Sequence, residues 1–126
     1  MTTLVYDAGA LSAAEANDQR MWRMHEEALV RGDPVVVAAP VLAQAWRGGP
    51  QPLLSRLLHG CLVEAMDEAV ARAAGRTCGK AGSSDVVDAT VAVLAVRHSA
   101  EVVTSDRKDI ESLSHAIGLR IVLRVV

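Results

Sequence analysis

Short runs of Val and Leu alternate along this chain with longer stretches whose apolar residues recur at helical spacing. The pattern predicts strands over residues 3–6, 34–38, 61–65, 101–104 and 119–126. It predicts helices over residues 8–30, in two pieces broken near Asn17 and Asp18, and over 40–46, 52–59, 66–78, 84–98 and 108–116. Strands that alternate with helices form βαβ units, so we expect an α/β fold, a three-layer α/β/α sandwich around a mainly parallel sheet of four to five strands. No internal repeat interrupts this pattern, which predicts a single domain over residues 1–126.

Glycine and proline mark several of the predicted element ends. Gly32 is placed to end the helix before the second strand. Pro40 is placed to open the next helix, since proline is tolerated in a first helical turn. Residues 79–83, which include two glycines, predict a loop before the helix over 84–98.

The composition is typical of a globular chain and narrows the classes of function. The 126 residues are 51% apolar and 22% charged, which suits one core built without disulfides. With no Phe, one Tyr and two Trp, the chain offers no aromatic platform for stacking single-stranded nucleic acid. The formal net charge of −2 argues against a protein that coats nucleic acid. Contact with RNA would therefore need a local basic rim around an acidic site.

Cysteine use and hydropathy predict the compartment. Cys61 and Cys78 lack the spacing of a zinc or redox motif and are typical of thiols in a reducing compartment. The longest apolar run, around residues 86–96, is too short to span a bilayer, and no signal peptide precedes the first strand. We expect a cytoplasmic protein that does not bind a membrane.

Two predicted strands run directly into an aspartate. Asp7 follows the first strand, and Asp106 follows the strand over 101–104. The carboxyl ends of parallel strands face one crevice, where sites form in open α/β sheets. We therefore expect both carboxylates at the same edge of the domain.

A third acidic group stands at the start of the most apolar helix. Asp85 and Asp88 are three residues apart and should lie near one another on the helix surface. If this end also faces the carboxyl edge, Asp7, Asp88 and Asp106 converge, with Asp85 and Asp109 close behind. Crowded carboxylates persist where a hard cation neutralises them, and oxygen ligands without His or Cys favour Mg²⁺ or Mn²⁺ over zinc. Such a metal suits phosphodiester hydrolysis.

Helix capping is the competing interpretation of these acids. Asp85, with Asp88 three residues later, imitates a capping box, and acids are favoured in any first helical turn. The same ambiguity applies to Asp106 and Asp109. Asp7 gains nothing from capping unless a helix begins directly after it.

Four segments together resemble a known family, the PIN-domain ribonucleases, and specifically the VapC-type toxins of bacterial toxin–antitoxin pairs. The matching segments are Leu4-Val5-Tyr6-Asp7, Pro40-Val41-Leu42-Ala43-Gln44, Asp85-Val86-Val87-Asp88-Ala89 and Val102-Val103-Thr104-Ser105-Asp106. Their order and spacing cover essentially the whole chain.

The resemblance implies a PIN-like fold in which Asp7, Asp88 and Asp106 are the metal-binding acids, with Asp85 and Asp109 near the site. It further implies dependence on Mg²⁺ or Mn²⁺, endoribonuclease activity on cellular RNA, a homodimer, and neutralisation by a small antitoxin. The helices between residues 8 and 31 are the expected surface for the antitoxin or for dimerisation.

One position departs from the family pattern. The usual second acid, on the helix after the second strand, falls here on Gln44. An amide oxygen can still hold a metal or a water but brings no negative charge. We expect a site that holds one metal, or that the substrate completes.

Basic residues close to these segments are candidate phosphate contacts, namely Arg47 near Gln44, and Arg107 and Lys108 beside Asp106. Each is equally compatible with an ordinary surface charge.

Three other classes compete with the nuclease. A phosphoacceptor signalling domain would need an Asp after the third strand and a Lys near the last strand, where this chain has Glu64 and no Lys. An aspartate-nucleophile phosphatase would need an acid at position 9, which is Gly9. A PIN-like RNA-binding or interaction module without catalysis is the third, and Gln44 is the residue that favours it.

Overall fold

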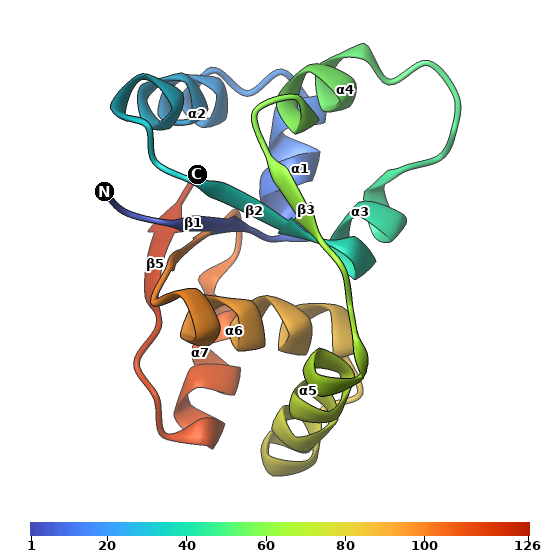
Figure 1. The fold of residues 1–126 in the computed structure, drawn as a ribbon, viewed down its shortest axis with the longest axis vertical. Coiled ribbons are helices and arrows are strands. Elements are labelled where there is room, and N and C mark those ends of the chain that lie inside the picture. The colour runs from blue at the N-terminus through green and yellow to red at the C-terminus, as the bar shows by residue number, and fades with distance from the viewer.

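The computed structural model describes all of residues 1–126 and contains one five-stranded sheet (Figure 1). Its strands are β1 (Leu4–Tyr6), β2 (Val35–Ala38), β3 (Leu62–Glu64), β4 (Glu101–Thr104) and β5 (Val122–Val125). They lie in the order β3-β2-β1-β4-β5, and every neighbouring pair is parallel. The first three strands lie side by side in chain order, and the chain then crosses over to place β4 on the other side of β1. The boundary between β1 and β4 is therefore the point where the strand order reverses.

Helices cover both faces of this sheet, as Figure 1 shows. They are α1 (Ala8–Glu15), α2 (Gln19–Arg31), α3 (Ala39–Ala45), α4 (Pro52–Leu58), α5 (Glu68–Ala81), α6 (Val86–His98) and α7 (Arg107–Ile117). One face carries α1, α2 and α4, and the other carries α5, α6 and α7. α3 follows β2 directly and contacts both α1 and α6. These three layers confirm the α/β/α sandwich predicted from the sequence.

The burial of the strands explains their composition. Every residue of β1 and β2 is buried, as are Val102, Val103 and Thr104 of β4. A strand that is covered on both faces needs an unbroken apolar run rather than alternation. The edge strands differ: Leu62 of β3 is 66% exposed, and Val122 of β5 is 48% exposed. No helix combines the length and apolarity needed to cross a membrane.

Most predicted element ends agree with the structure. The break between α1 and α2 falls at Asn17, whose φ of 56° is left-handed. Gly32 ends α2 in the left-handed conformation, where its N–H reaches the carbonyls of Ala28 and Leu29. Pro40 lies in the first turn of α3.

Three predicted boundaries were wrong. Residues 79–81, predicted as loop, continue α5, because Gly82 with a φ of 64° supplies the left-handed C-cap and one internal Gly79 does not end a helix. The same helix begins at Glu68 rather than Met66, because Asp67 caps it. The last strand is four residues long, since its partner β4 offers only four residues for pairing.

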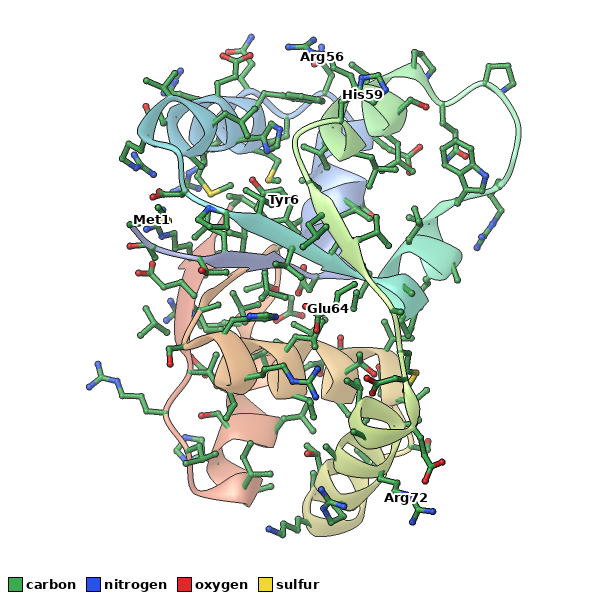
Figure 2. The ribbon with its side chains drawn as sticks, in the orientation of Figure 1. Met1, Tyr6, Arg56, His59, Glu64 and Arg72 are labelled. Atoms are coloured by element: carbon green, nitrogen blue, oxygen red, sulfur yellow. The ribbon has the colours of Figure 1, made fainter.

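A buried polar pair joins β1 to α2. The Tyr6 hydroxyl lies 2.8 Å from Nδ1 of His25, and Figure 2 places Tyr6 on the face of the sheet beneath α2. The His25 ring also packs edge-on against Trp22, with centroids 5.8 Å apart. His25 is 2% exposed, and burial lowers the pKa of this imidazole, as does the charge of Arg56, while Glu26 raises it. The folded protein therefore holds His25 in its neutral form.

This burial makes stability depend on pH. Unfolded His takes up a proton at about pH 6.5, whereas folded His25 resists protonation, so the free energy of unfolding should fall as the pH drops below about 6.5. His25→Gln stays neutral and retains polar atoms for the Tyr6 hydroxyl, and we expect a smaller loss of stability between pH 7.5 and 5. Urea denaturation at both pH values measures this. The control is His59→Gln, at an exposed position. An equal pH dependence in wild type and His25→Gln would contradict the assignment.

Candidate metal centre

Asp7 and Asp106 meet at the carboxyl edge of the sheet. β1 pairs with β4 in register, Tyr6 opposite Val103, and the next residue, Asp7, donates its backbone N–H to the Val103 carbonyl. Asp7 is 6% exposed. Burial raises the pKa of Asp7 and the charge of Asp106 raises it further, against hydrogen bonds from Thr104 and backbone N–H groups that lower it. This edge lies where the strand order reverses, the usual place for a site in an open α/β sheet.

The other three acids gather where α5, α6 and α7 meet. Asp85, Asp88 and Asp109 line a hollow of about 140 Å³, together with Ser83 and Ser112. The pKa of Asp88 is raised to about 7, and burial is the largest cause. The charge and hydrogen bonding of Asp85 and the charges of Asp109 and Asp7 raise this pKa further. Asp88 therefore links this hollow to the carboxylates at the strand ends.

We call these five residues the acidic cluster: Asp7, Asp85, Asp88, Asp106 and Asp109. None of them forms an ion pair, and no basic side chain contributes to the pKa of Asp7 or Asp88. Carboxylates crowded without counter-charge repel each other and favour uptake of a proton or a cation.

The donor atoms fit a hard cation, but no ready-made cage exists. No group of three or more His, Cys, Asp or Glu side chains is arranged closely enough to hold a metal ion. The ligands on offer are oxygens, which Mg²⁺ and Mn²⁺ prefer. Mg²⁺ commonly takes only one or two carboxylates and keeps several waters. The acidic cluster therefore fits a partly hydrated Mg²⁺ or Mn²⁺ better than a fully enclosed ion.

Three members of the cluster also cap helices. In each of them Oδ1 accepts a backbone N–H from the first turn of the helix that follows. Asp7 caps α1 (2.9 Å), Asp85 caps α6 (3.0 Å) and Asp106 caps α7 (3.0 Å). A helix does begin directly after Asp7, so capping accounts for part of its placement. Asp88, in the first turn of α6, is the member of the predicted triad that caps no helix.

Thr104 is a site residue that the sequence analysis missed. It is 1% exposed, and its Oγ1 donates to the Asp106 carbonyl (2.8 Å) and accepts the Asp106 N–H (3.1 Å). It also lowers the pKa of Asp7 as a hydrogen-bond partner, its one proton going either to that carboxylate or to the Asp106 carbonyl. Thr104 thus positions both strand-end acids, and the signal for it was a hydroxyl residue two positions before Asp106.

Thr104→Val should weaken the site more than the fold. The loss of these hydrogen bonds should cost about 1 kcal/mol of stability, because Asp106 is exposed and water can replace the hydroxyl at its backbone groups. Thr104→Ser retains the hydroxyl and should restore both stability and any metal-dependent activity. Thermal unfolding and RNA cleavage of the two variants test this. If Val at position 104 behaved like Ser in both measurements, Thr104 would have no positioning role.

Gly9 permits the close approach of the two strand ends. A Cβ on Gly9, in the first turn of α1, would lie 2.2 Å from Oγ of Ser105 and 3.2 Å from its backbone N. A larger residue here would require the Ser105 side chain to rotate and the turn that carries Asp106 to shift by a few tenths of an ångström.

Gln44 and Arg47 lie at and just after the end of α3. Gln44 is exposed near the end of α3 and forms no side-chain hydrogen bond. The Arg47 guanidinium folds back onto the backbone carbonyls of Ala43 (3.2 Å) and Trp46 (2.8 Å). Arg47 thus serves the end of α3 instead of reaching towards the acids.

The two basic residues after Asp106 differ from one another. Arg107 lies 3.6 Å from Glu111, one turn further along α7. Lys108 is exposed and forms no ion pair, so it is the freer of the two for contact with a phosphate.

The end of β3 does not suit the phosphoacceptor alternative. Glu64, which ends this strand, is held on the α6 side of the sheet (Figure 2). Its carboxylate accepts from His98 (2.7 Å) and lies 3.4 Å from Arg97. A carboxylate that contacts two residues of α6 stabilises the packing of β3 against that helix and is not free for phosphorylation.

No family model and no curated protein matches this sequence. Among solved structures, the chain is similar to one from the crystal structure of VapBC2 from Rickettsia felis bound to a DNA fragment from its promoter. The TM-score is 0.74, with 14% sequence identity over 99% of each chain. The two chains share one fold. This likeness agrees with the PIN-like architecture expected from the sequence and, at this identity, shows the fold alone.

Proposed function

We propose that this chain is a metal-dependent endoribonuclease that acts as the toxin of a type II toxin–antitoxin pair. The observation that carries the proposal is the acidic cluster, in which Asp7 and Asp106 lie at the edge where the strand order reverses and Asp85, Asp88 and Asp109 line the adjoining hollow, all five without an ion pair. The fold likeness to a VapBC2 chain supports the same proposal.

In this proposal the acidic residues bind the metal and the basic residues after Asp106 contact the RNA. Asp7, Asp88 and Asp106 would hold Mg²⁺ or Mn²⁺, with Asp85 beside them, and the helix caps position the carboxylates of Asp7, Asp85 and Asp106. The chemistry that the bound ion supplies is a water of lowered pKa and neutralisation of charge on the scissile phosphate. Lys108, and Arg107 after release from Glu111, contact neighbouring phosphates of the RNA.

The proposed assembly follows from the same resemblance. The partners are cellular RNA, a small antitoxin and a second copy of the chain, in the cytoplasm. The similar Rickettsia felis structure is a VapBC2 complex on promoter DNA, which supports an antitoxin partner for this chain.

Cleavage of RNA by the purified chain tests the proposal directly. We expect cleavage with Mg²⁺ or Mn²⁺ and none with EDTA. Induced expression should arrest growth, and co-expression of a small antitoxin encoded beside it should relieve the arrest. Cleavage that persists in EDTA, or growth unaffected by the chain alone, would count against a metal-dependent toxin.

A second candidate is a PIN-like RNA-binding or interaction module without catalysis. Two observations favour it: no three ligands are arranged for a metal, and Gln44 brings no charge. RNA binding that is independent of metal and never followed by cleavage would establish this alternative.

Gln44→Glu tests whether a missing charge limits the site. If Gln44 stands beside the metal, the added carboxylate should tighten Mg²⁺ binding and raise the cleavage rate by about ten-fold, the equivalent of about 1.4 kcal/mol. Calorimetric titration with Mg²⁺ and cleavage rates measure the two effects. Gln19→Glu is the matched control, because Gln19 is exposed at the start of α2 and forms no side-chain hydrogen bond. If both Mg²⁺ affinity and rate were unchanged in Gln44→Glu, the one-metal hypothesis would be wrong.

A further inference from the structure

An apolar groove runs along the layer of α5, α6 and α7 and on to β5, away from the acidic cluster. One part, of about 220 Å³, lies between α5, α6 and the end of α7, and a second, of about 280 Å³, continues to β5. Val96 and Leu119 line both parts, so the two are continuous. In Figure 1 the three helices lie together on one side of the sheet.

The floor of the groove is apolar and open to solvent. Its aliphatic residues are Val93, Val96, Ile117, Leu119, Ile121 and Val122. Val96 is 42% exposed, and Leu119 and Val122 are each 48% exposed. Large apolar side chains that are exposed together, not singly, mark an interaction surface.

The charged residues that border the two parts are basic, namely Arg76, Lys80 and Arg120. An acid, Glu111, lines the hollow next to Arg120 and is paired with Arg107. None of the three cations forms an ion pair, whereas six other arginines do. On a chain of net charge −2, this local excess of positive charge selects an acidic partner.

We propose that this groove binds an acidic amphipathic helix of another protein. The apolar face of that helix, with residues at positions i, i+3, i+4 and i+7, packs on Val96 and Leu119. Its flanking carboxylates pair with Arg76, Lys80 and Arg120. Such a partner satisfies the apolar floor and the basic rim together.

The same features disfavour two other occupants. RNA could pair with the rim, but the floor is aliphatic and offers no aromatic ring for a base. A second copy of this chain, docked groove to groove across a two-fold axis, would bring like-charged rims together.

The proposal is independent of the nuclease. The groove shares no lining residue with the hollow that contains Asp85, Asp88 and Asp109. Loss of helix binding should therefore leave RNA cleavage unchanged, and loss of cleavage should leave helix binding unchanged.

Fluorescence anisotropy of a labelled synthetic peptide tests the groove in the full chain. The probe is a helix of about five turns with Leu at i, i+3, i+4 and i+7 and Glu on its flanks, and its scrambled sequence is the comparison. We expect Kd to rise at least about ten-fold for the scrambled peptide, for Val96→Asp and for the double variant Arg76→Glu, Arg120→Glu. Higher salt should weaken binding of the intended probe to the wild type. The matched control, Arg20→Glu with Arg23→Glu on α2, makes the same charge change far from the groove and should leave Kd unchanged.

Circular dichroism and thermal unfolding of each variant separate lost binding from lost folding. If Val96→Asp does not fold, the two exposed arginine substitutions decide the question. Equal binding of the intended and scrambled peptides overturns the proposal, as does unchanged binding by the Arg76→Glu, Arg120→Glu variant. If a short single-stranded RNA displaces the peptide and itself loses affinity for that variant, the groove is an RNA surface and the proposal is wrong.

Discussion

Replacing Asp88 by Asn should abolish metal-dependent RNA cleavage and at the same time stabilise the metal-free protein. Burial and the charges of Asp85, Asp109 and Asp7 raise the pKa of Asp88 to about 7, so its ionised form is disfavoured in the fold. Asn removes that charge with little change of shape. The stability gain should be about 1 kcal/mol, discounted because Asp88 is only half-buried. Loss of a metal ligand should lower the cleavage rate by about 100-fold or more.

The difference in stability between Asp88→Asn and the wild type should depend on pH. A carboxyl whose folded pKa is raised stabilises the fold fully at low pH and loses that contribution as the pH rises to about 7. The advantage of Asp88→Asn over wild type should therefore grow between pH 5 and 8 in EDTA. Mg²⁺ should raise the melting temperature of the wild type and have little effect on the variant, because a ligand stabilises only the state that binds it.

Thermal unfolding with and without Mg²⁺, together with cleavage rates, measures all of these effects. Glu68→Gln is the control, because it removes one negative charge from a residue whose side chain is 79% exposed and remote from the cluster. An Asp88→Asn protein that cleaves RNA like the wild type would remove Asp88 from the site. An Asp88→Asn protein that is less stable than the wild type in EDTA would show that the carboxylates of the acidic cluster do not repel Asp88 in the folded protein.

Trp22→Ala should produce the largest loss of stability of the substitutions considered. Trp22 is 7% exposed, and its Nε1 donates to the Ala14 carbonyl at 3.0 Å, which joins α2 to α1. It also packs against His25, and the Arg56 guanidinium lies 4.4 Å from its ring centroid. Removal of a buried Trp typically costs about 3–5 kcal/mol, which is comparable to the whole stability of a marginal domain.

Trp46→Ala is the matched control for this loss. Trp46 is 43% exposed, so its removal leaves no closed cavity and should cost about 1 kcal/mol or less. Urea denaturation of the two variants gives the comparison. Equal losses at the two positions would mean that Trp22 does not anchor α2 to α1.

Local patterns predicted the elements because they depend on neighbours along the chain. The apolar run of β2 and the stop at Gly32 follow from composition and from backbone conformations that glycine adopts easily. The end of α5 was missed because two glycines compete there, and a helix passes through Gly79 when Gly82 can cap it. Helix caps were predicted as an alternative for Asp85 and Asp106, and both act as caps.

Long-range contacts of the site were not predictable in the same way. The approach of Asp109 to Asp88 depends on how α7 packs against α6, and the role of Thr104 depends on the turn after β4. Arg47 was a candidate phosphate contact on proximity along the chain, but its side chain satisfies carbonyls at the end of α3. The spacing of residues along the chain does not show whether an arginine side chain will bond to a nearby helix end or extend towards another element.

That Asp7 and Asp106 follow parallel strands and share one edge is a consequence of the local pattern, because side-by-side parallel strands end together. The hollow with Asp85, Asp88 and Asp109 beside that edge is a consequence of how α5, α6 and α7 pack, and so is the absence of an ion pair to any of these acids. The tertiary structure also placed Arg76, Lys80 and Arg120 around one apolar groove, although two of them come from α5 and one from the turn before β5. Spacing along a chain specifies neighbours within a helix or strand, whereas packing of side chains between elements brings distant charges together.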